Sequence, residues 1–214
     1  MNKKLIIALS LLFFSVAAFT QSSSEAKNIL DKTYNDYLKS NGIQLNFKVV
    51  TTDARGKNPY TEKGVAKIKR NSFTFSTENI NVWYDGKTQW WLMKDVNEVN
   101  ISNPSNQDLT SSPTGLLGLY KTGFTLKAPV SKTVNGKSAY VIEMIPTVQR
   151  SDFKAASVAV DKNNNTLLQV NLTLKDNMNI KVDISNYNAN YNFNDSTFVF
   201  NKSLYPGVEI VDLR

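Results

Sequence analysis

Hydrophobic residues follow a helical period near the start of the chain and a strand-like period over most of the rest. Residues 22–41 carry apolar side chains on one helical face, with Ser22 and Glu25 at the spacing of a capping box and Gly42 where the helix should end. From residue 43 onward apolar and polar residues alternate, and clusters of Asn, Asp and Gly separate the runs. We therefore predict an N-terminal helix followed by turn-connected strands, without alternation of strands and helices.

Residues 80–102 contain all three tryptophans and form the most apolar part of the strand pattern. Asp85-Gly86 tolerates the positive φ of a type I′ turn, so we predict a two-residue hairpin loop that pairs Tyr84 with Lys87. The alternation gives one face Ile80, Val82, Tyr84, Trp91 and Met93, and the other face Trp83, Trp90 and Leu92. A half-solvated antiparallel hairpin is apolar on one face only. Either other parts of the protein cover both faces, or one face lines a cavity. We expect the face with Trp83, Trp90 and Leu92 to line the cavity.

A second, short helix is expected in the apolar segment that follows Pro113. Its apolar side chains, Leu116, Leu117, Leu119 and Tyr120, wrap most of the way round about two helical turns. A helix of this length is not stable alone in water, so it must dock on an apolar surface. Together with roughly eleven strands, this pattern predicts a mainly β fold with a few helices, a closed or half-closed antiparallel barrel whose edges are paired or covered.

Residues 1–20 have the pattern of a signal peptide, with two lysines, an apolar core and small residues at positions 16–18. The apolar core is too short to span a bilayer, and no stop-transfer pattern follows it. We expect cleavage after Ala18 or Thr20 and a mature, exported and soluble chain. That chain, residues 21–214, is long enough to form a single domain that is stabilised by burial without disulfides.

Composition excludes several kinds of chemistry. The chain has neither His nor Cys, so Ser-His triads, thiolate nucleophiles and imidazole or thiolate metal sites are excluded. The formal net charge is +7, but no basic cluster with interleaved aromatic residues indicates a nucleic-acid partner. Five acids could carry carboxylate chemistry: Asp161, Asp176, Asp183, Asp195 and Glu143. None has surroundings that would shift its pKa, so we expect no enzyme, no metal and no cofactor, with a carboxylate hydrolase as the least favoured alternative.

The order of several features along the chain carries a family resemblance. An opening helix is followed by a strand that ends in Lys69-Arg70, a tryptophan hairpin over residues 83–90, a Leu-Leu segment near mid-chain, and C-terminal segments at 198–200 and 206–210. In this order and spacing they resemble the LolA family of periplasmic outer-membrane lipoprotein carriers. The resemblance extends over nearly the whole mature chain.

The resemblance implies a half-open β-barrel in which an N-terminal helix and short lid helices cover an apolar cavity. It implies a monomeric carrier in the periplasm of a Gram-negative bacterium, which accepts acylated lipoproteins from an inner-membrane ABC-type lipoprotein-releasing complex and delivers them to an outer-membrane receptor or membrane. No covalent chemistry is involved. The family arginine that ties the lid to the barrel matches Arg70, although Asn71 follows where the family often has Pro.

Aromatic and leucine side chains of the hairpin, the preceding strand and the short helix are the candidates for binding acyl chains. They are Phe73, Phe75, Trp83, Trp90, Trp91, Leu92, Leu116, Leu117, Leu119 and Tyr120. An alternative is a binding or sensing module of the same barrel type, which recognises lipoproteins or other amphiphiles as a signal. Both functions need an apolar cavity, and burial of acyl chains supplies affinity at ~0.8 kcal/mol per methylene.

Overall fold

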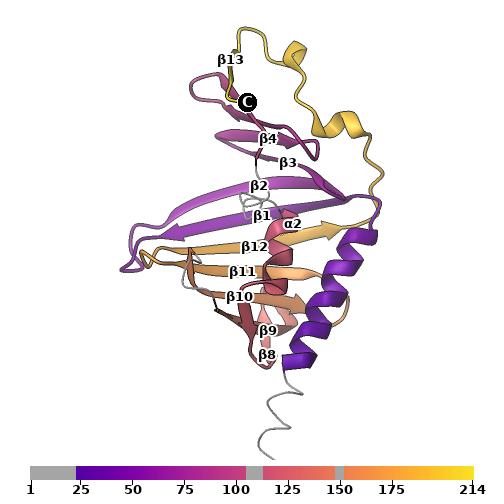
Figure 1. The fold of residues 1–214 in the computed structure, drawn as a ribbon, viewed down its shortest axis with the longest axis vertical. Helices are drawn as coiled ribbons and strands as arrows, with labels where there is room; N and C mark the ends of the chain where they lie inside the picture. The colour runs from indigo at the N-terminus through magenta and orange to yellow at the C-terminus, as the bar shows by residue number, and fades with distance from the viewer. Residues whose placement is uncertain (1–22, 105–112, 148–151) are drawn as a thin grey trace, which may run out of the picture.

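The computed structural model describes residues 23–104, 113–147 and 152–214. Over these ranges the chain forms an N-terminal helix, residues 23–39, and one sheet of thirteen strands that curls around it (Figure 1). The strand order is β13-β6-β5-β4-β3-β2-β1-β12-β11-β10-β9-β7, with β8 paired to β9. The predicted mainly β fold is therefore confirmed. The predicted signal peptide, residues 1–20, lies outside the described residues.

The strands and short helices have the following bounds. The first half of the sheet contains β1 (Ile43–Thr52), β2 (Tyr60–Lys69), β3 (Ser72–Thr77), β4 (Ile80–Tyr84), β5 (Gln89–Met93) and β6 (Glu98–Ser102). The second half contains β7 (Phe124–Leu126), β8 (Val130–Val134), β9 (Lys137–Pro146), β10 (Phe153–Asp161), β11 (Leu167–Leu174) and β12 (Asn179–Asn188). The other elements are α2 (Pro113–Gly118), η2 (Leu119–Lys121), η3 (Asp195–Phe198), η4 (Lys202–Leu204) and β13 (Glu209–Asp212).

Strand β1 joins the two halves of the sheet. It pairs antiparallel with β2 on one side and with β12 on the other. In this register Phe47 lies opposite Gly64 and Ile184. A Cβ on Gly64 would lie 2.6 Å from Cζ of Phe47 and 2.4 Å from the carbonyl oxygen of Ser76, so only glycine leaves room for the Phe47 ring here.

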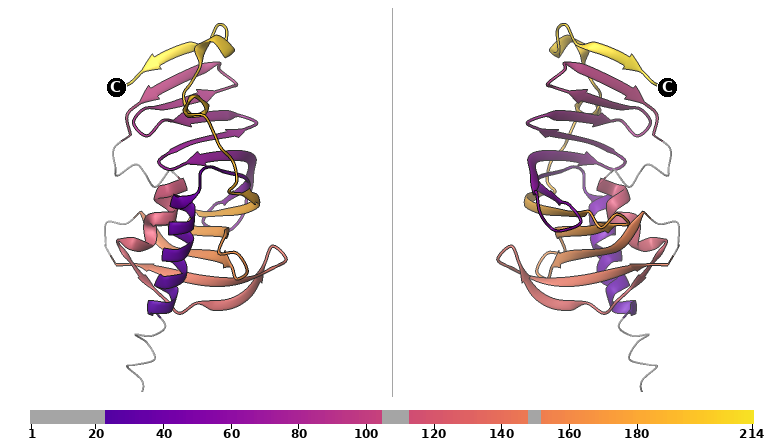
Figure 2. Two further views of the ribbon diagram at one scale, coloured as in Figure 1. Left: turned by 90° about the vertical axis from the view of Figure 1, so that its right-hand side faces the viewer. Right: turned by 90° about the vertical axis from the view of Figure 1, so that its left-hand side faces the viewer.

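The N-terminal helix and α2 cover one face of the second half of the sheet, as Figure 2 shows. Ala26 and Leu30 of the helix pack with Tyr120 of η2 against buried side chains of β9, β10 and β11. The helix buries one apolar face, as its pattern predicted, and its charged residues lie on the exposed side. This packed core anchors the helix at the face of the sheet that also carries the cavity described below.

The loop of the tryptophan hairpin differs from the prediction. Four residues separate β4 from β5, Tyr84 pairs with Gln89, and Asp85 does not have the positive φ of a type I′ turn. Its Oδ1 instead accepts hydrogen bonds from the backbone N–H groups of Lys87, at 2.8 Å, and Thr88, at 2.7 Å. The register is thus shifted by two residues. Because two is the side-chain period of a strand, the predicted composition of each face is still correct.

A two-residue turn at Asn135-Gly136 joins β8 to β9. Both residues have positive φ, 50° and 77°, as a type I′ turn requires, and Val134 pairs with Lys137. The sheet has thirteen strands where roughly eleven were predicted. In the C-terminal segment, Phe198 ends η3, and Val199 and Phe200 follow it outside any strand.

The C-terminal segment, residues 190–208, covers the outer face of the hairpin. Phe200 and Tyr205 contact the ring of Trp83, with ring centroids 5.4 and 5.7 Å apart, and Val208 packs in the same cluster as Trp90 and Leu92. Strand β13 then pairs in parallel with β6. Our expectation that the Trp83, Trp90 and Leu92 face lines a cavity is therefore wrong, because a segment more than a hundred residues away in sequence packs on it.

Two contacts fix the start of this segment to the sheet. The Nζ atom of Lys69 donates to the backbone oxygen of Phe193 at 2.8 Å and to Oδ1 of Asp195 at 2.7 Å. Phe198, which is only 1% exposed, packs edge-to-face on the Phe193 ring. The neighbouring Val199 is 40% exposed. The C-terminal segment is thus an integral part of the fold and not a loose tail.

We therefore predict that Phe198→Ala lowers the free energy of unfolding by about 3–5 kcal/mol, because it leaves a cavity under the segment. Val199→Ala is the matched control and should change it by less than about 0.5 kcal/mol. Urea denaturation followed by tryptophan fluorescence measures both. An equally small decrease in the free energy of unfolding for both variants would contradict the structural role of the segment.

Candidate functional site

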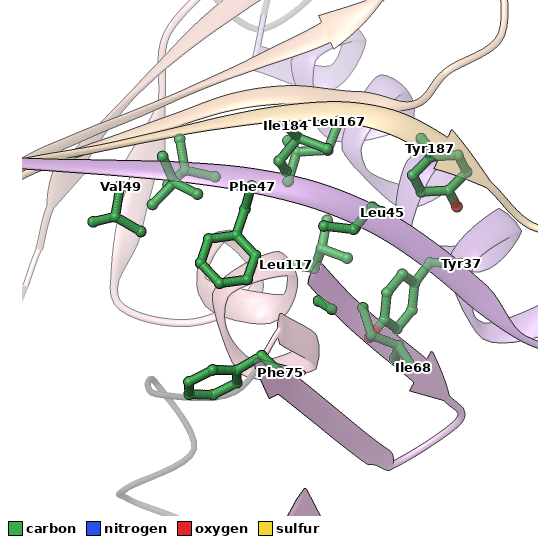
Figure 3. A pocket seen from close by; sticks show the side chains of 13 residues that line it. Tyr37, Leu45, Phe47, Val49, Ile68, Phe75, Leu117, Leu167, Ile184 and Tyr187 are labelled. Carbon is green, nitrogen blue, oxygen red and sulfur yellow. The ribbon is translucent and has the colours of Figure 1, made fainter. Parts of the chain in front are cut away.

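An apolar cavity of about 200 Å³ lies between the sheet and the two helices (Figure 3). Strands β1, β2, β3, β11 and β12 supply most of its walls, the N-terminal helix supplies one tyrosine and α2 one leucine. The lining residues are Tyr37, Leu45, Phe47, Val49, Ala66, Ile68, Phe75, Leu117, Leu167, Val170, Val182, Ile184 and Tyr187. Apart from two tyrosine hydroxyls, these side chains are hydrocarbon. The cavity can therefore bind an apolar group without leaving buried polar atoms unpaired.

The aromatic wall of the cavity continues into a cluster on the inner face of the hairpin. The ring of Phe75 packs edge-to-face on Phe47, with centroids 6.2 Å apart, and on Trp91, at 6.1 Å. Phe73 stacks on Phe75 and contacts Tyr84. These aromatic side chains are rigid and hold the wall in place. The two apolar faces of the hairpin thus have separate roles, since the inner face supports the cavity and the outer face carries the C-terminal segment.

The cavity is closed on the helix side by a lid, which we define as α2 together with η2. Leu117 of α2 lines the cavity. The lid is tied to the N-terminal helix by Tyr120 of η2, whose hydroxyl donates to Oδ1 of Asp31 at 2.7 Å. Beside it, Nζ of Lys121 lies 3.4 Å from the centroid of the Tyr34 ring, a cation–π contact. These two contacts, together with the burial of the Tyr120 ring in the core beneath the N-terminal helix, therefore hold the lid in place.

These contacts shift the pKa values of both partners. Hydrogen bonds from Lys27 and then from Tyr120 hold the pKa of the Asp31 carboxyl below its usual value of 3.8. Burial, followed by the hydrogen bond to Asp31, raises the pKa of the Tyr120 hydroxyl. Both groups therefore keep, at neutral pH, the protonation states that their hydrogen bond requires.

The candidate acyl-chain-binding residues divide into several groups. Phe75 and Leu117 line the cavity, whereas Phe73 and Trp91 belong to the aromatic cluster behind its wall. Tyr120 of the lid is buried beside Leu30 and Thr33, and Leu119 of the lid is half-buried. The side chain of Leu116 lies outside the described residues. The remaining three, Trp83, Trp90 and Leu92, lie on the outer face of the hairpin, under the C-terminal segment.

Most of the lining residues were not among the candidates. They come from β1, β2, β11 and β12, where alternation alone identifies inward-facing side chains such as Leu45, Phe47 and Val49. That alternation was a usable signal in the sequence. It could not distinguish the inward residues that line a cavity from those that pack in the core.

Arg70 lies in the two-residue turn between β2 and β3, where its φ is 54°. Its side chain is exposed and forms no hydrogen bond or ion pair with another described residue. The neighbouring Lys69 forms the ion pair with Asp195 instead. The latch role that the family resemblance implies for Arg70 stays a prediction.

The five candidate acids serve turns and ion pairs, and none lines the cavity. The carboxylate of Asp161 accepts from the backbone of Asn163 and pairs with Lys137. Asp176 accepts a hydrogen bond from the backbone N–H of Met178, and Asp183 accepts one from the side chain of Gln169. Asp195 and Glu143 form ion pairs with Lys69 and Lys127, respectively. A carboxylate hydrolase would therefore have no acid pair at this cavity. Among the described residues, no cluster of three or more Asp and Glu could hold a metal ion, and no helix has the length and apolarity needed to cross a membrane.

The Asp31–Tyr120 contact predicts a pH-dependent stability. Because the folded pKa of Asp31 lies below the unfolded value, its stabilising contribution is complete above pH 3.8 and is lost as the pH falls through the folded pKa. Tyr120→Phe removes one of the two hydrogen bonds responsible. We expect this variant to melt at a lower temperature near neutral pH, and the difference from the unchanged protein to shrink below pH 3.8.

Thermal melts over this pH range measure the effect. Tyr140→Phe is the control, because the Tyr140 ring contacts Lys162 while its hydroxyl has no carboxylate partner. A melting-temperature difference for Tyr120→Phe that stays constant from neutral to acidic pH would show that Asp31 does not stabilise the lid.

Comparison with known proteins identifies the family. The family model of the outer membrane lipoprotein carrier protein LolA matches residues 16–171. No curated protein matches the chain significantly. Among solved structures, the chain is similar to an uncharacterized conserved protein from Thermus thermophilus, with 11% identity, coverage of 88% of this chain and 99% of that chain, and a TM-score of 0.59.

Two further solved structures are similar at lower TM-scores. A LolA superfamily protein from Nitrosomonas europaea is 13% identical, with 82% of this chain and 97% of that chain covered and a TM-score of 0.43. The lipoprotein LppX from Mycobacterium tuberculosis is 16% identical, with 78% of this chain and 99% of that chain covered and a TM-score of 0.45. At such identities a likeness concerns the fold alone. The family model, however, covers more than half of the sequence, and the chain therefore belongs to the outer membrane lipoprotein carrier protein LolA family.

Proposed function

We propose that this protein is a periplasmic carrier, which binds the acyl chains of lipoproteins released from the inner membrane and delivers them to the outer membrane. The observation that carries the proposal is the apolar cavity beneath the lid. Its hydrocarbon lining matches an acyl chain, and membership of a family described as lipoprotein carriers supports the class of cargo. Residues 1–20 would direct export. An inner-membrane ABC-type complex would supply the cargo, and an outer-membrane receptor would accept it.

With the lid in this position, the cavity is too small for a whole acyl chain. A cavity of roughly 150 Å³ in another protein takes up benzene, so about 200 Å³ accepts only part of an acyl chain. Full loading would require the lid to move and Leu117 to withdraw. The hydrogen bond of Tyr120 and the cation–π contact of Lys121 are each worth about 1–3 kcal/mol or less, and burial of the Tyr120 side chain adds roughly 1.5–3 kcal/mol. A dozen buried methylenes are worth on the order of 10 kcal/mol before costs. Cargo binding can therefore offset lid opening.

A cavity-filling variant tests this proposal. Ala66 of β2 lines the cavity and is 5% exposed, whereas the side chain of its neighbour Val65 points to the other face of the sheet. Ala66→Leu should place hydrocarbon in the cavity and reduce the affinity for a triacylated lipopeptide by at least about ten-fold while the protein stays folded. Displacement of an uncharged fluorescent probe, N-phenyl-1-naphthylamine, measures the affinity. Val65→Leu is the matched control, and undiminished lipopeptide binding by Ala66→Leu would contradict the assignment of the cavity.

Arg70 has a backbone conformation that supports a role for its side chain. Seven described residues other than glycine have positive φ, and the other six are asparagines. Asn tolerates this region, whereas a long side chain pays roughly 1 kcal/mol for it. A cation at such a position supports the hypothesis that Arg70 acts as a latch, reaching the lid or a partner in a state other than this one.

We predict that Arg70→Leu folds and binds the lipopeptide but does not pass it on. Transfer of a purified acylated lipoprotein from the carrier to outer-membrane vesicles measures this step. Arg55→Leu, which changes an exposed arginine in the β1–β2 loop, should transfer cargo normally. Normal transfer by Arg70→Leu would remove Arg70 from the mechanism.

A further inference from the structure

A second cavity, of about 230 Å³, adjoins the apolar one and differs from it in chemistry. It lies between the N-terminal helix, the turn that joins β10 to β11, and the end of β12. Five polar residues line it: Thr33, Asp36, Asn164, Asn165 and Thr166. We call this second cavity the polar vestibule because of these five residues, although apolar atoms supply most of its lining surface.

The polar vestibule and the apolar cavity share a boundary. Tyr37, Leu117, Leu167 and Tyr187 line both spaces. Figure 3 shows Tyr37 and Tyr187 at one end of the apolar cavity, with Val49 at the other. The boundary therefore includes the end of the apolar cavity marked by Tyr37 and Tyr187, and Leu117 of the lid and Leu167 also form part of it. A molecule that occupies both spaces would have an apolar tail toward Val49 and a polar head beyond the two tyrosines.

Asp36 supplies the charge at the polar vestibule. It is an exposed residue and the one acid among the lining residues, and no described Lys or Arg lines the space. Its carboxylate forms no hydrogen bond or ion pair with another described residue, and the flanking Lys32 and Lys39 of the same helix do not line the vestibule. Burial, and then the charge of Asp36, raises the pKa of Tyr187 to about 12, so this tyrosine is a neutral hydroxyl at physiological pH. An ionised carboxylate accepts hydrogen bonds but donates none.

We propose that the polar vestibule holds the head of a bound amphiphile whose tail lies in the apolar cavity, and that Asp36 favours an uncharged, hydrogen-bond-donating head over an anionic one. This inference rests on the proposed function, because it requires acyl chains in the apolar cavity. The hydroxyl and amide groups of an acylated glyceride or lipopeptide can donate to Asp36. A sulfate or ionised carboxylate head brings a second negative charge beside it and has no proton to donate.

Matched amphiphiles test the preference. Monopalmitoyl glycerol and hexadecyl sulfate have tails of the same length, and each can displace N-phenyl-1-naphthylamine from the full-length mature protein. Asp36→Asn removes the charge and keeps the shape, and Asp36 has no described partner whose loss would unfold the helix. Asp95→Asn is the matched control, because Asp95 is an exposed acid in the β5–β6 turn.

We expect Asp36→Asn to strengthen binding of hexadecyl sulfate about three- to five-fold, with binding of monopalmitoyl glycerol changed less than about two-fold. Asp95→Asn should change neither. If Asp36→Asn leaves the ratio of the two affinities as it is in the unchanged protein, the head-group preference is wrong while tail binding stands. If neither amphiphile displaces the probe from the unchanged protein, the apolar cavity does not take acyl chains and the proposed function fails with it.

Discussion

The pairing of β1 with β2 on one side and with β12 on the other holds two sets of hairpins in one continuous curled sheet. Paired residues in an antiparallel ladder face the same side, so this junction aligns Phe47 with Ile184 on the inner face and needs Gly64 opposite the ring. The cavity lies along this junction. The N-terminal helix and the lid close a space whose position the strand pairing has already determined.

Both faces of the tryptophan hairpin are apolar, and they are covered in different ways. The C-terminal segment packs fully on the outer face, where Phe200 and Tyr205 contact Trp83. The inner face is left partly unfilled. The cavity of about 200 Å³ lacks the packing contacts of a filled core, and the fold has a separate, packed core beneath the N-terminal helix. Cargo that enters the cavity would supply part of the missing contacts, which links binding to an incompletely packed interior.

The sequence predicted the fold class, the N-terminal helix and the composition of both hairpin faces, because these depend on local periodicity. It also identified Phe75 and Leu117, which line the cavity. It assigned the hairpin register wrongly because the Asp85 side chain closes a four-residue loop that competes with a type I′ turn. It assigned the wrong hairpin face to the cavity because Phe200 and Tyr205, which cover Trp83, come from distant sequence. Alternation shows which side chains face inward, but it does not show which of them line the cavity, because that depends on how the strands and helices pack together.

The central claim is that the apolar cavity carries the acyl chains of a lipoprotein. Native mass spectrometry of the protein purified from the cells that make it tests this most directly, because burial of acyl chains should keep cargo bound in a gentle preparation. We predict a population heavier than the mature chain by the mass of an acylated polypeptide, and its loss in Ala66→Leu. A protein that is always empty, and that stays empty when mixed with purified lipoprotein, would contradict the account.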